Sequence, residues 1–273
     1  MLLAATNEIA IIICNPCGEP EARIWSPRFL NLSTLRRKQY VFSAGSNGFN
    51  WICKMIGIKI FNQLQNLNYL SRRKPVLNTE IEKTSFQINT ILEQINALVW
   101  NPEENYKKLR YFEAIAARYY WQIIGKQLPD PYKFTKRIKK NPLDGFNPSI
   151  NYLYGMLRNQ IETAILGTGL DPALGCMHRD GFKMPSLVFD LMEPFRPLVD
   201  SLLLRNILSG KLKNMFEINE EKIYILTRQG RKCLIEMFNE HLQQKILFQN
   251  RKSGFQNHIL LETRNLAKMI NQQ

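Results

Sequence analysis

The sequence contains no apolar run of the about 18 residues that a membrane-spanning helix needs. Its start is apolar, but Asn7 and Glu8 interrupt that stretch before it could act as a signal sequence. We therefore expect a protein without a membrane span that stays in the cytoplasm.

Cysteine and histidine are scarce. The five cysteines are odd in number and scattered, which excludes a disulfide framework, so we expect them to be reduced. Cys14 and Cys17 form one CxxC pair, but no second pair follows at the spacing of a zinc site. Because His241 and His258 fall in ordinary amphipathic helical patterns, His178 is the main candidate for a nitrogen ligand.

Acidic residues are few relative to basic ones. The chain has 37 lysines and arginines against 23 aspartates and glutamates, which gives a formal charge of +14. Such an excess favours a polyanionic partner, nucleic acid first, although a solvated basic surface is the alternative. The apolar fraction of 45% is that of a globular protein and excludes extensive disorder.

Most of the chain has a helical pattern. From Trp51 onward, apolar residues recur at spacings of three and four, as in amphipathic helices. Four prolines and several basic residues between positions 129 and 148 predict a long irregular loop. Helices are predicted at residues 51–70, 81–99, 103–125, 148–168, 186–209, 228–245 and 258–270.

The first 30 residues have a different pattern. The β-branched run at 8–14 predicts one buried strand, and no partner strand for it is evident. Residues 222–226 predict a second short strand, followed by Thr227 as the cap of the next helix. We expect a mainly α fold in which a small β segment precedes a helical domain.

Two sequence elements could each present a metal ligand. Glu113 lies at the edge of the apolar stripe of its predicted helix, where it is either a ligand or a boundary carboxylate paired with a basic side chain. His178 ends a loop of glycines and proline that forces tight turns. This imidazole is either a metal ligand or an ordinary structural group held by hydrogen bonds.

Asp190 and Glu193 supply further carboxylates. Their spacing puts them on one face of a helix, where they repel each other unless a cation lies nearby. Pro194 costs about 3 kcal/mol inside a helix and predicts a kink. The alternative is an architectural kink in which Arg196 neutralises the pair. Carboxylates with one imidazole suit Mg²⁺ or Mn²⁺, and such an ion on a basic protein indicates phosphoryl transfer on nucleic acid.

Three blocks of the sequence carry a resemblance to a known family. They span residues 110–121 around Glu113, residues 148–157 running on to His178, and residues 186–197 with Asp200. In order and spacing these blocks resemble the CRISPR-associated integrases of spacer acquisition, the Cas one family. The similarity extends over nearly the whole chain.

The resemblance implies a metal-dependent DNA endonuclease and integrase. Such an enzyme inserts short DNA fragments into a CRISPR array by transesterification, as part of antiviral defence. By analogy Glu113, His178 and Glu193 bind Mg²⁺ or Mn²⁺, and Asp190 assists catalysis. The basic residues that would hold the DNA backbone include Arg36, Arg37, Arg110, Lys136 and Lys139.

The resemblance also implies partners and a domain plan. The partners are double-stranded DNA, a second copy in a homodimer, and the small second CRISPR-associated protein of the acquisition complex. Family members begin with a β-rich domain, so residues 1–30 are interpreted as the remnant of a truncated N-terminal domain and its linker, and residues 31–273 as the catalytic domain. The alternatives are a transposon integrase with the same catalytic domain, or a DNA-binding remnant without catalysis.

Overall fold

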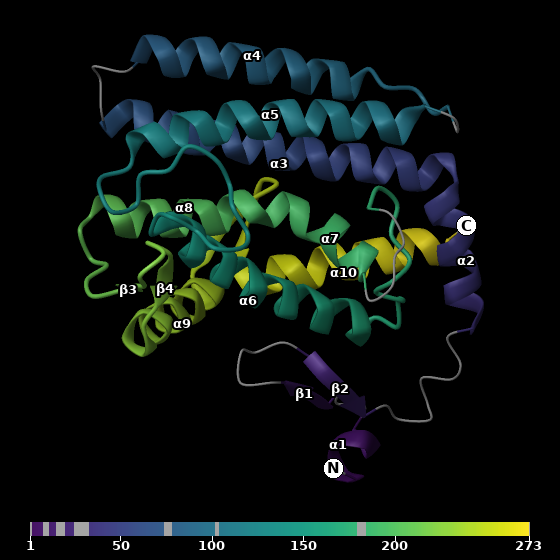
Figure 1. Cartoon of the computed structure of the whole chain (residues 1–273). Coiled ribbons are helices and arrows are strands. Elements are labelled where there is room, and N and C mark those ends of the chain that lie inside the picture. Colours follow the sequence, from purple (N-terminus) through teal and green to yellow (C-terminus); the bar gives the residue numbers. More distant parts are fainter. Residues whose placement is uncertain are drawn as a thin grey trace. The chain divides into compact units, whose positions relative to one another are not determined.

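The computed structural model describes residues 2–7, 11–14, 20–24, 33–73, 78–101, 104–178 and 184–272. Over this part of the chain the fold is mainly helical, as predicted, and its strands lie in two-stranded antiparallel hairpins (Figure 1). The boundary predicted near residue 30 lies outside the described residues. None of the described helices combines the length and the apolar character needed to cross a membrane.

The chain forms two compact units, and neither is a continuous segment. Unit 1 comprises Met1–Ile52, Gly155–Met192 and Leu242–Gln273. Unit 2 comprises Cys53–Tyr154 and Glu193–His241. Each unit is described by itself below.

Unit 2 contains most of α3 (Ser46–Arg73) together with α4 (Asn78–Asn96) and α5 (Asn105–Gln127). Each of these helices overlaps a predicted range, and α4 packs along α5 (Figure 1). Their apolar stripes meet in a core because residues spaced three and four apart share one helix face. The buried members include Ile56, Ile60, Leu67, Ile88, Leu109, Ala116 and Tyr120.

The segment between α5 and α6 (Phe146–Gly167) is irregular, as predicted, and aromatic packing anchors it within unit 2. The ring of Phe134 stacks on the ring of Phe146 with 4.6 Å between centroids. Gly125 allows this approach, since a Cβ there would lie 2.1 Å from the carbonyl oxygen of Phe134. The loop is therefore fixed at its base while its basic residues Lys136, Lys139 and Lys140 are exposed.

The helix predicted at 186–209 is interrupted where the kink was expected. Helix α7 (Ser186–Met192) closes the second of the three stretches of unit 1, and the 3-10 turn η3 (Glu193–Phe195) and α8 (Arg196–Leu208) follow in unit 2. Pro194 has no backbone N–H for the helical bond to the residue four before it, so the regular helix ends here. The interruption places Glu193 in a tight turn with a 5% exposed side chain.

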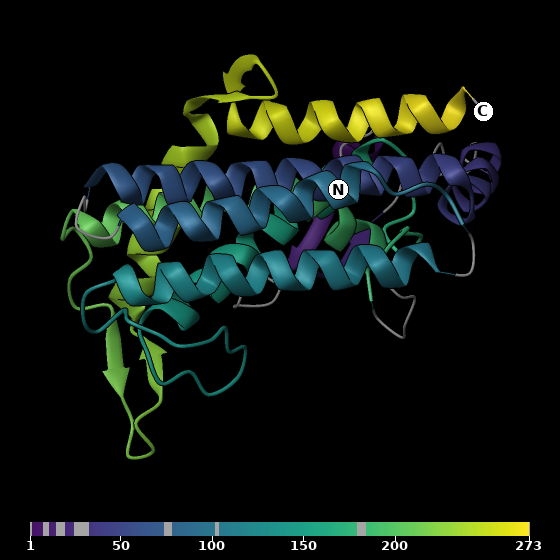
Figure 2. The ribbon, with the colours of Figure 1, turned by 90° about the horizontal axis from the view of Figure 1, so that it is seen from above.

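A hairpin in unit 2 was only half predicted. Strand β4 (Tyr224–Leu226) falls within the predicted strand, but its antiparallel partner β3 (Phe216–Ile218) was missed. Figure 2 shows this hairpin projecting from the unit 2 helices. Helix α9 (Arg228–Gln243) follows, and its predicted cap is confirmed because the Thr227 hydroxyl accepts a hydrogen bond of 2.9 Å from the N–H of Gly230.

Unit 1 corrects two expectations about the start of the chain. Strand β1 (Ile11–Cys14), predicted to be alone, pairs antiparallel with β2 (Pro20–Ile24). The short β2 was missed because its proline, glutamate and arginine do not follow a strand pattern. The helix α2 (Ser33–Ala44) was also missed, since basic residues interrupt its apolar pattern, and it packs against α10 (Phe255–Asn271).

The hairpin of β5 (Lys245–Phe248) and β6 (Arg251–Gly254) in unit 1 was not predicted either. Its two-residue turn places Gln249 and Asn250 at φ of 47° and 60° without any glycine, so the usual turn signal is absent. His258 donates a hydrogen bond of 3.1 Å to the carbonyl oxygen of Ile246 in this hairpin. The structural role predicted for His258 is thereby confirmed.

The predicted reduced state of the cysteines holds wherever the side chains are described. Cys53, Cys176 and Cys233 are free. The side chain of Cys14 and the whole of Cys17 lie outside the described residues.

Candidate functional site

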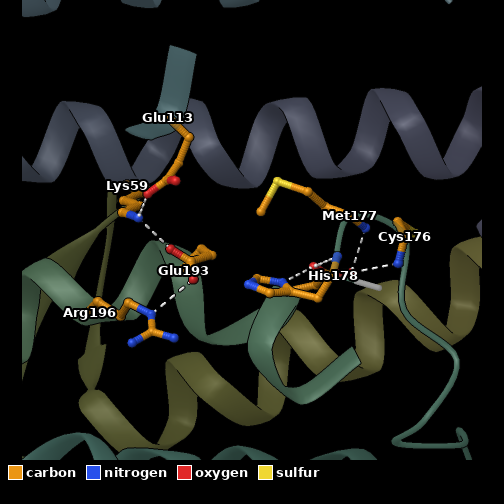
Figure 3. A network of polar contacts seen from close by, with 8 residues as sticks. Lys59, Glu113, Cys176, Met177, His178, Glu193 and Arg196 are labelled. Atoms are coloured by element: carbon orange, nitrogen blue, oxygen red, sulfur yellow. Dashed lines mark hydrogen bonds and ion pairs between the residues drawn. The ribbon is translucent and has the colours of Figure 1, made fainter. Parts of the chain in front are cut away.

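Two predicted ligands meet at one buried cation in unit 2. Lys59 on α3 is buried, and its Nζ forms ion pairs with Oε1 of Glu113 on α5 and, at 2.6 Å, with Oε2 of Glu193 in η3. Arg196 completes the group, because its Nε donates to Oε1 of Glu193 at 2.9 Å. Figure 3 shows Lys59 between the two carboxylates. We refer to Lys59, Glu113, Glu193 and Arg196 as the Lys59 cluster.

The Lys59 cluster balances two positive against two negative charges in a largely buried setting. Burial opposes the charge of Lys59, but the charges of Glu113 and Glu193 outweigh burial and raise its pKa above the usual value. Arg196 behaves in the same way, with burial opposed by Glu193 first, and its pKa is also raised. The charged forms of Lys59 and Arg196 are therefore favoured. Removing one member of the cluster leaves a buried charge without its counterion.

A second buried network, of hydrogen bonds around Asp200, lies next to Arg196. Asp200 on α8 accepts hydrogen bonds from the hydroxyls of Tyr154, at 2.6 Å, and Tyr120, at 3.1 Å. The guanidinium of Arg196 lies 4.9 Å from the centroid of the Tyr154 ring, a cation–π contact. Burial raises the pKa of Asp200 to about 6 despite these donors and the nearby charge of Arg137. Asp200 and Tyr154 thus help to fix the side chain that holds Glu193.

His178 and Asp190 form a separate arrangement in unit 1. The fully buried carboxylate of Asp190 accepts backbone hydrogen bonds from Cys176, Met177 and His178. The same carboxylate contacts Nδ1 of His178 at 2.6 Å. A carboxylate accepts from Nδ1–H, so a neutral His178 keeps its proton on Nδ1 and presents the lone pair of Nε2.

The loop that carries His178 is held by hydrogen bonds and close packing. We call residues 169–178 the histidine loop. Gln39 on α2 braces it, donating to the carbonyl oxygens of Asp171 at 2.8 Å and Leu174 at 3.0 Å. At Gly175 a Cβ would lie 2.6 Å from the carbonyl carbon of Ser186 and 2.8 Å from Oδ2 of Asp190. A glycine is therefore required for the loop to approach α7 this closely.

The predicted site residues thus fall into two pairs. The structure brings Glu113 and Glu193 together through Lys59, and it joins His178 to Asp190. The alternative interpretation was that each glutamate is a carboxylate paired with a basic side chain. The structure contains such pairs as well, since Lys59 pairs with Glu113 and Arg196 pairs with Glu193. Asp190 on α7 accepts hydrogen bonds from the end of the histidine loop.

The sequence pattern did not predict three members of the site, namely Lys59, Tyr154 and Asp200. Lys59 is one of two lysines on α3, and its partner Glu113 is 54 positions away. Asp200 and Tyr154 were noted within the resembling blocks but received no role. A basic residue in line with the apolar stripe of α3 was the available signal for Lys59.

The carboxylate pair fits a divalent cation by its chemistry. Mg²⁺ and Mn²⁺ prefer carboxylate oxygens, and two carboxylates here already share one cation, the ammonium of Lys59. No group of three or more histidine, cysteine, aspartate or glutamate side chains in the described part of the chain has the arrangement of a metal site. The predicted third ligand, His178, belongs to unit 1, whereas the two glutamates belong to unit 2.

The family model and the curated relative that match this chain carry the same family name. The family model described as CRISPR associated protein Cas1 matches residues 1–240. The CRISPR-associated endonuclease Cas1 of Korarchaeum cryptofilum (strain OPF8) is 28% identical over 269 residues, which cover 95% of this chain and 77% of that protein.

Two solved structures share the fold. A casposase bound to integration product has a TM-score of 0.79 and 25% sequence identity, over 99% of this chain and 78% of that chain. A chain of a Cas6-RT-Cas1--Cas2 complex has a TM-score of 0.78 and 20% identity, over 99% of this chain and 29% of that chain. At the latter identity the likeness shows the fold alone.

Proposed function

The chain belongs to the CRISPR-associated Cas1 family, and we propose that it is a metal-dependent DNA endonuclease and integrase that inserts short DNA fragments into a CRISPR array. The Korarchaeum relative is named an endonuclease, and the casposase structure is described as bound to integration product. Both names fit a chain with a formal charge of +14, because joining DNA ends requires binding a polyanion.

The observation that carries the proposal is the convergence of Glu113 and Glu193 on one buried cation. We assign these two carboxylates, with Nε2 of His178, as ligands of Mg²⁺ or Mn²⁺. When bound, such an ion polarises a phosphodiester and stabilises charge on the attacking and leaving oxygens. Transesterification replaces one phosphodiester bond with another, so no ATP is consumed.

The other residues of the two arrangements orient these ligands. Asp190 accepts the hydrogen bond from Nδ1–H of His178, which leaves the lone pair of Nε2 for the metal ion. Arg196 holds one oxygen of Glu193 and is itself packed on Tyr154. We therefore propose that Asp190 positions the imidazole of His178. Its carboxylate already accepts hydrogen bonds from three backbone N–H groups and contacts Nδ1 of His178.

Several exposed basic residues are candidates for the DNA backbone. Arg37, Lys136 and Lys139 are exposed, whereas Arg36 and Arg110 are partly buried. Arg137, in the same loop, donates to Asn147 and, at 2.7 Å, to Asn151. Its side chain is thereby committed to holding the loop, which leaves the neighbouring lysines to contact phosphates.

We propose two protein partners besides double-stranded DNA. One is a second copy of this chain, as in a homodimer. The other is the small second CRISPR-associated protein, since a structure with the same fold is described as a complex that contains Cas2. Size measurements by multi-angle light scattering, with and without purified Cas2, test both associations.

The proposed function is tested by joining a labelled duplex to supercoiled DNA that contains a CRISPR repeat. We expect product only with Mn²⁺ or Mg²⁺, and a loss of at least about 100-fold for Glu193→Ala and His178→Ala, since each removes a ligand. Lys126→Met, which removes an exposed ion pair with Glu80, is the control and keeps wild-type activity. Wild-type activity in His178→Ala would refute the assignment of the ligand set.

A transposon integrase is the second candidate, favoured by the casposase similarity over 99% of this chain. The two functions differ in the DNA that is joined. A transposon integrase prefers donor DNA with transposon-end sequences, whereas the spacer integrase prefers a target with a CRISPR repeat. Competition between these substrates in one reaction decides between the candidates.

A further inference from the structure

We infer that Lys59 competes with the divalent cation for Glu113 and Glu193. This competition raises the metal concentration that is needed to fill the site. The inference rests on the proposed function, since it concerns the same carboxylate pair. It assigns Lys59 as a positioning residue that holds the site assembled without metal and withdraws when metal binds.

The geometry around Nζ supports this role. Lys59 is buried on α3, and its ammonium contacts one oxygen of each glutamate. Without this cation the two carboxylates would face each other in a largely buried space, where like charges repel strongly. Lys59 therefore keeps Glu113 and Glu193 close together in the metal-free chain.

The charge balance shows why both cations do not remain together. Lys59 and Arg196 already match the two glutamates, so a divalent ion between the same carboxylates would add two positive charges to a neutral, buried group. An unbalanced buried charge is strongly unfavourable. Since Arg196 is packed on Tyr154 and bound to the other oxygen of Glu193, Lys59 is the cation that leaves.

The side-chain chemistry suits a cation that moves. Lysine carries a compact charge on four flexible methylene groups, whereas a guanidinium binds in a fixed planar geometry. Nζ can leave the carboxylates by side-chain rotation while α3 stays in place. Competition of this kind lowers the apparent affinity of the site for metal. It also lowers the affinity of the two carboxylates for other cations.

The first test measures Mn²⁺ binding by isothermal titration calorimetry. We expect Lys59→Met to bind Mn²⁺ at least about tenfold more tightly than the wild type, because the competing charge is gone. Lys126→Met in the same unit is the matched control and leaves the affinity unchanged. Unchanged or weaker binding by Lys59→Met overturns the inference.

A second test does not depend on how well Lys59→Met folds. An amine-reactive reagent is applied briefly to the wild-type chain, and modification of Lys59 is quantified by peptide mass spectrometry. Saturating Mn²⁺ is expected to raise the labelling of Lys59 several-fold and to leave that of exposed Lys232 unchanged. Equal or lower labelling of Lys59 with Mn²⁺ contradicts displacement.

The two proposals fail in different ways. If neither the wild type nor Lys59→Met binds Mn²⁺, the metal site and the competition fall together. If the wild type binds Mn²⁺ and Glu193→Gln does not, but Lys59→Met gains no affinity, the site stands and the competition alone is wrong.

Discussion

The carboxylate of Asp190 serves two purposes at once, because it closes the histidine loop and sets the proton position on His178. It accepts three backbone hydrogen bonds as well as the contact from Nδ1. An acid that is merely near a metal would not need this many donors. The orientation of the imidazole is therefore built into the fold before any ligand arrives.

Asp190→Asn tests this coupling. The amide keeps the shape but loses the charge, and its NH₂ group cannot accept the bonds that Oδ2 accepts now. We expect metal affinity or joining activity to fall about 10- to 100-fold. The measurement is the Mn²⁺ dependence of the joining rate.

The matched control for that variant is Asp144→Asn. Asp144 is a buried aspartate that accepts a hydrogen bond of 2.7 Å from the N–H of Asn147 at the start of α6, with no histidine in this contact. Its variant should lose about 1 kcal/mol of stability and keep its Mn²⁺ dependence. An equal change of Mn²⁺ dependence in both variants would reduce Asp190 to a purely structural role.

Asp200 gives the free energy of unfolding a pH dependence. Burial raises its pKa from 3.8 to about 6 in the folded chain, so the folded state binds more protons than the unfolded state between these values. The stabilisation is fully present below about pH 4 and is lost as the pH rises through about 6. A rise of the pKa from 3.8 to about 6 corresponds to a full contribution of about 3 kcal/mol to the free energy of unfolding.

Urea unfolding of the wild type and Asp200→Asn at pH 4 and pH 7 measures this contribution. The asparagine does not titrate, so the wild type should lose about 2 kcal/mol more than the variant between the two pH values. Other titrating groups cancel in this difference. A difference that is the same at both pH values would show that Asp200 does not titrate in this range.

At the scale of the elements, the histidine loop depends on the absence of a side chain at Gly175. We expect Gly175→Ala to cost about 2 to 3 kcal/mol of stability, because the new Cβ would overlap the backbone of Ser186 and an oxygen of Asp190. Joining activity should fall as well, since the same clash displaces the partner of His178. Thermal unfolding and the joining assay measure the two effects.

Gly155→Ala is the counterpart in the same unit. Gly155 lies inside α6, and a Cβ there meets no atom within 4 Å. This variant should be neutral or more stable by up to about 1 kcal/mol. If the two variants had equal stabilities, the close packing at Gly175 would not be a constraint.

Periodicity predicted the long helices, but not the short hairpins. The helices α3, α4 and α5 have clear apolar stripes, whereas the β5–β6 hairpin turns at Gln249 and Asn250 without a glycine. For the site, the resemblance supplied Glu113, His178 and Glu193. It could not supply Lys59, because the pairing of a helical lysine with a glutamate 54 positions away depends on how α3 and α5 pack.

At the scale of the whole molecule, the excess positive charge should govern DNA affinity. We expect the triple variant Lys136→Gln, Lys139→Gln, Lys140→Gln to weaken binding to all duplexes alike, since phosphates carry no sequence information. The slope of log affinity against log salt should fall by up to about 0.9 for each phosphate that the loop no longer neutralises. Fluorescence anisotropy at several salt concentrations measures this slope, and an unchanged slope would exclude this loop from the DNA-binding surface.

The helices α3, α6 and α9 each begin in one compact unit and end in the other. Unit 1 is assembled from three stretches of sequence and unit 2 from two. A single genetic crossover anywhere between them therefore cannot transplant one unit intact from a relative. The proposed ligands Glu113 and Glu193 lie in unit 2, and His178 and Asp190 lie in unit 1. These residues are interleaved along the sequence, so recombination within the gene tends to separate residues that the proposed function requires together.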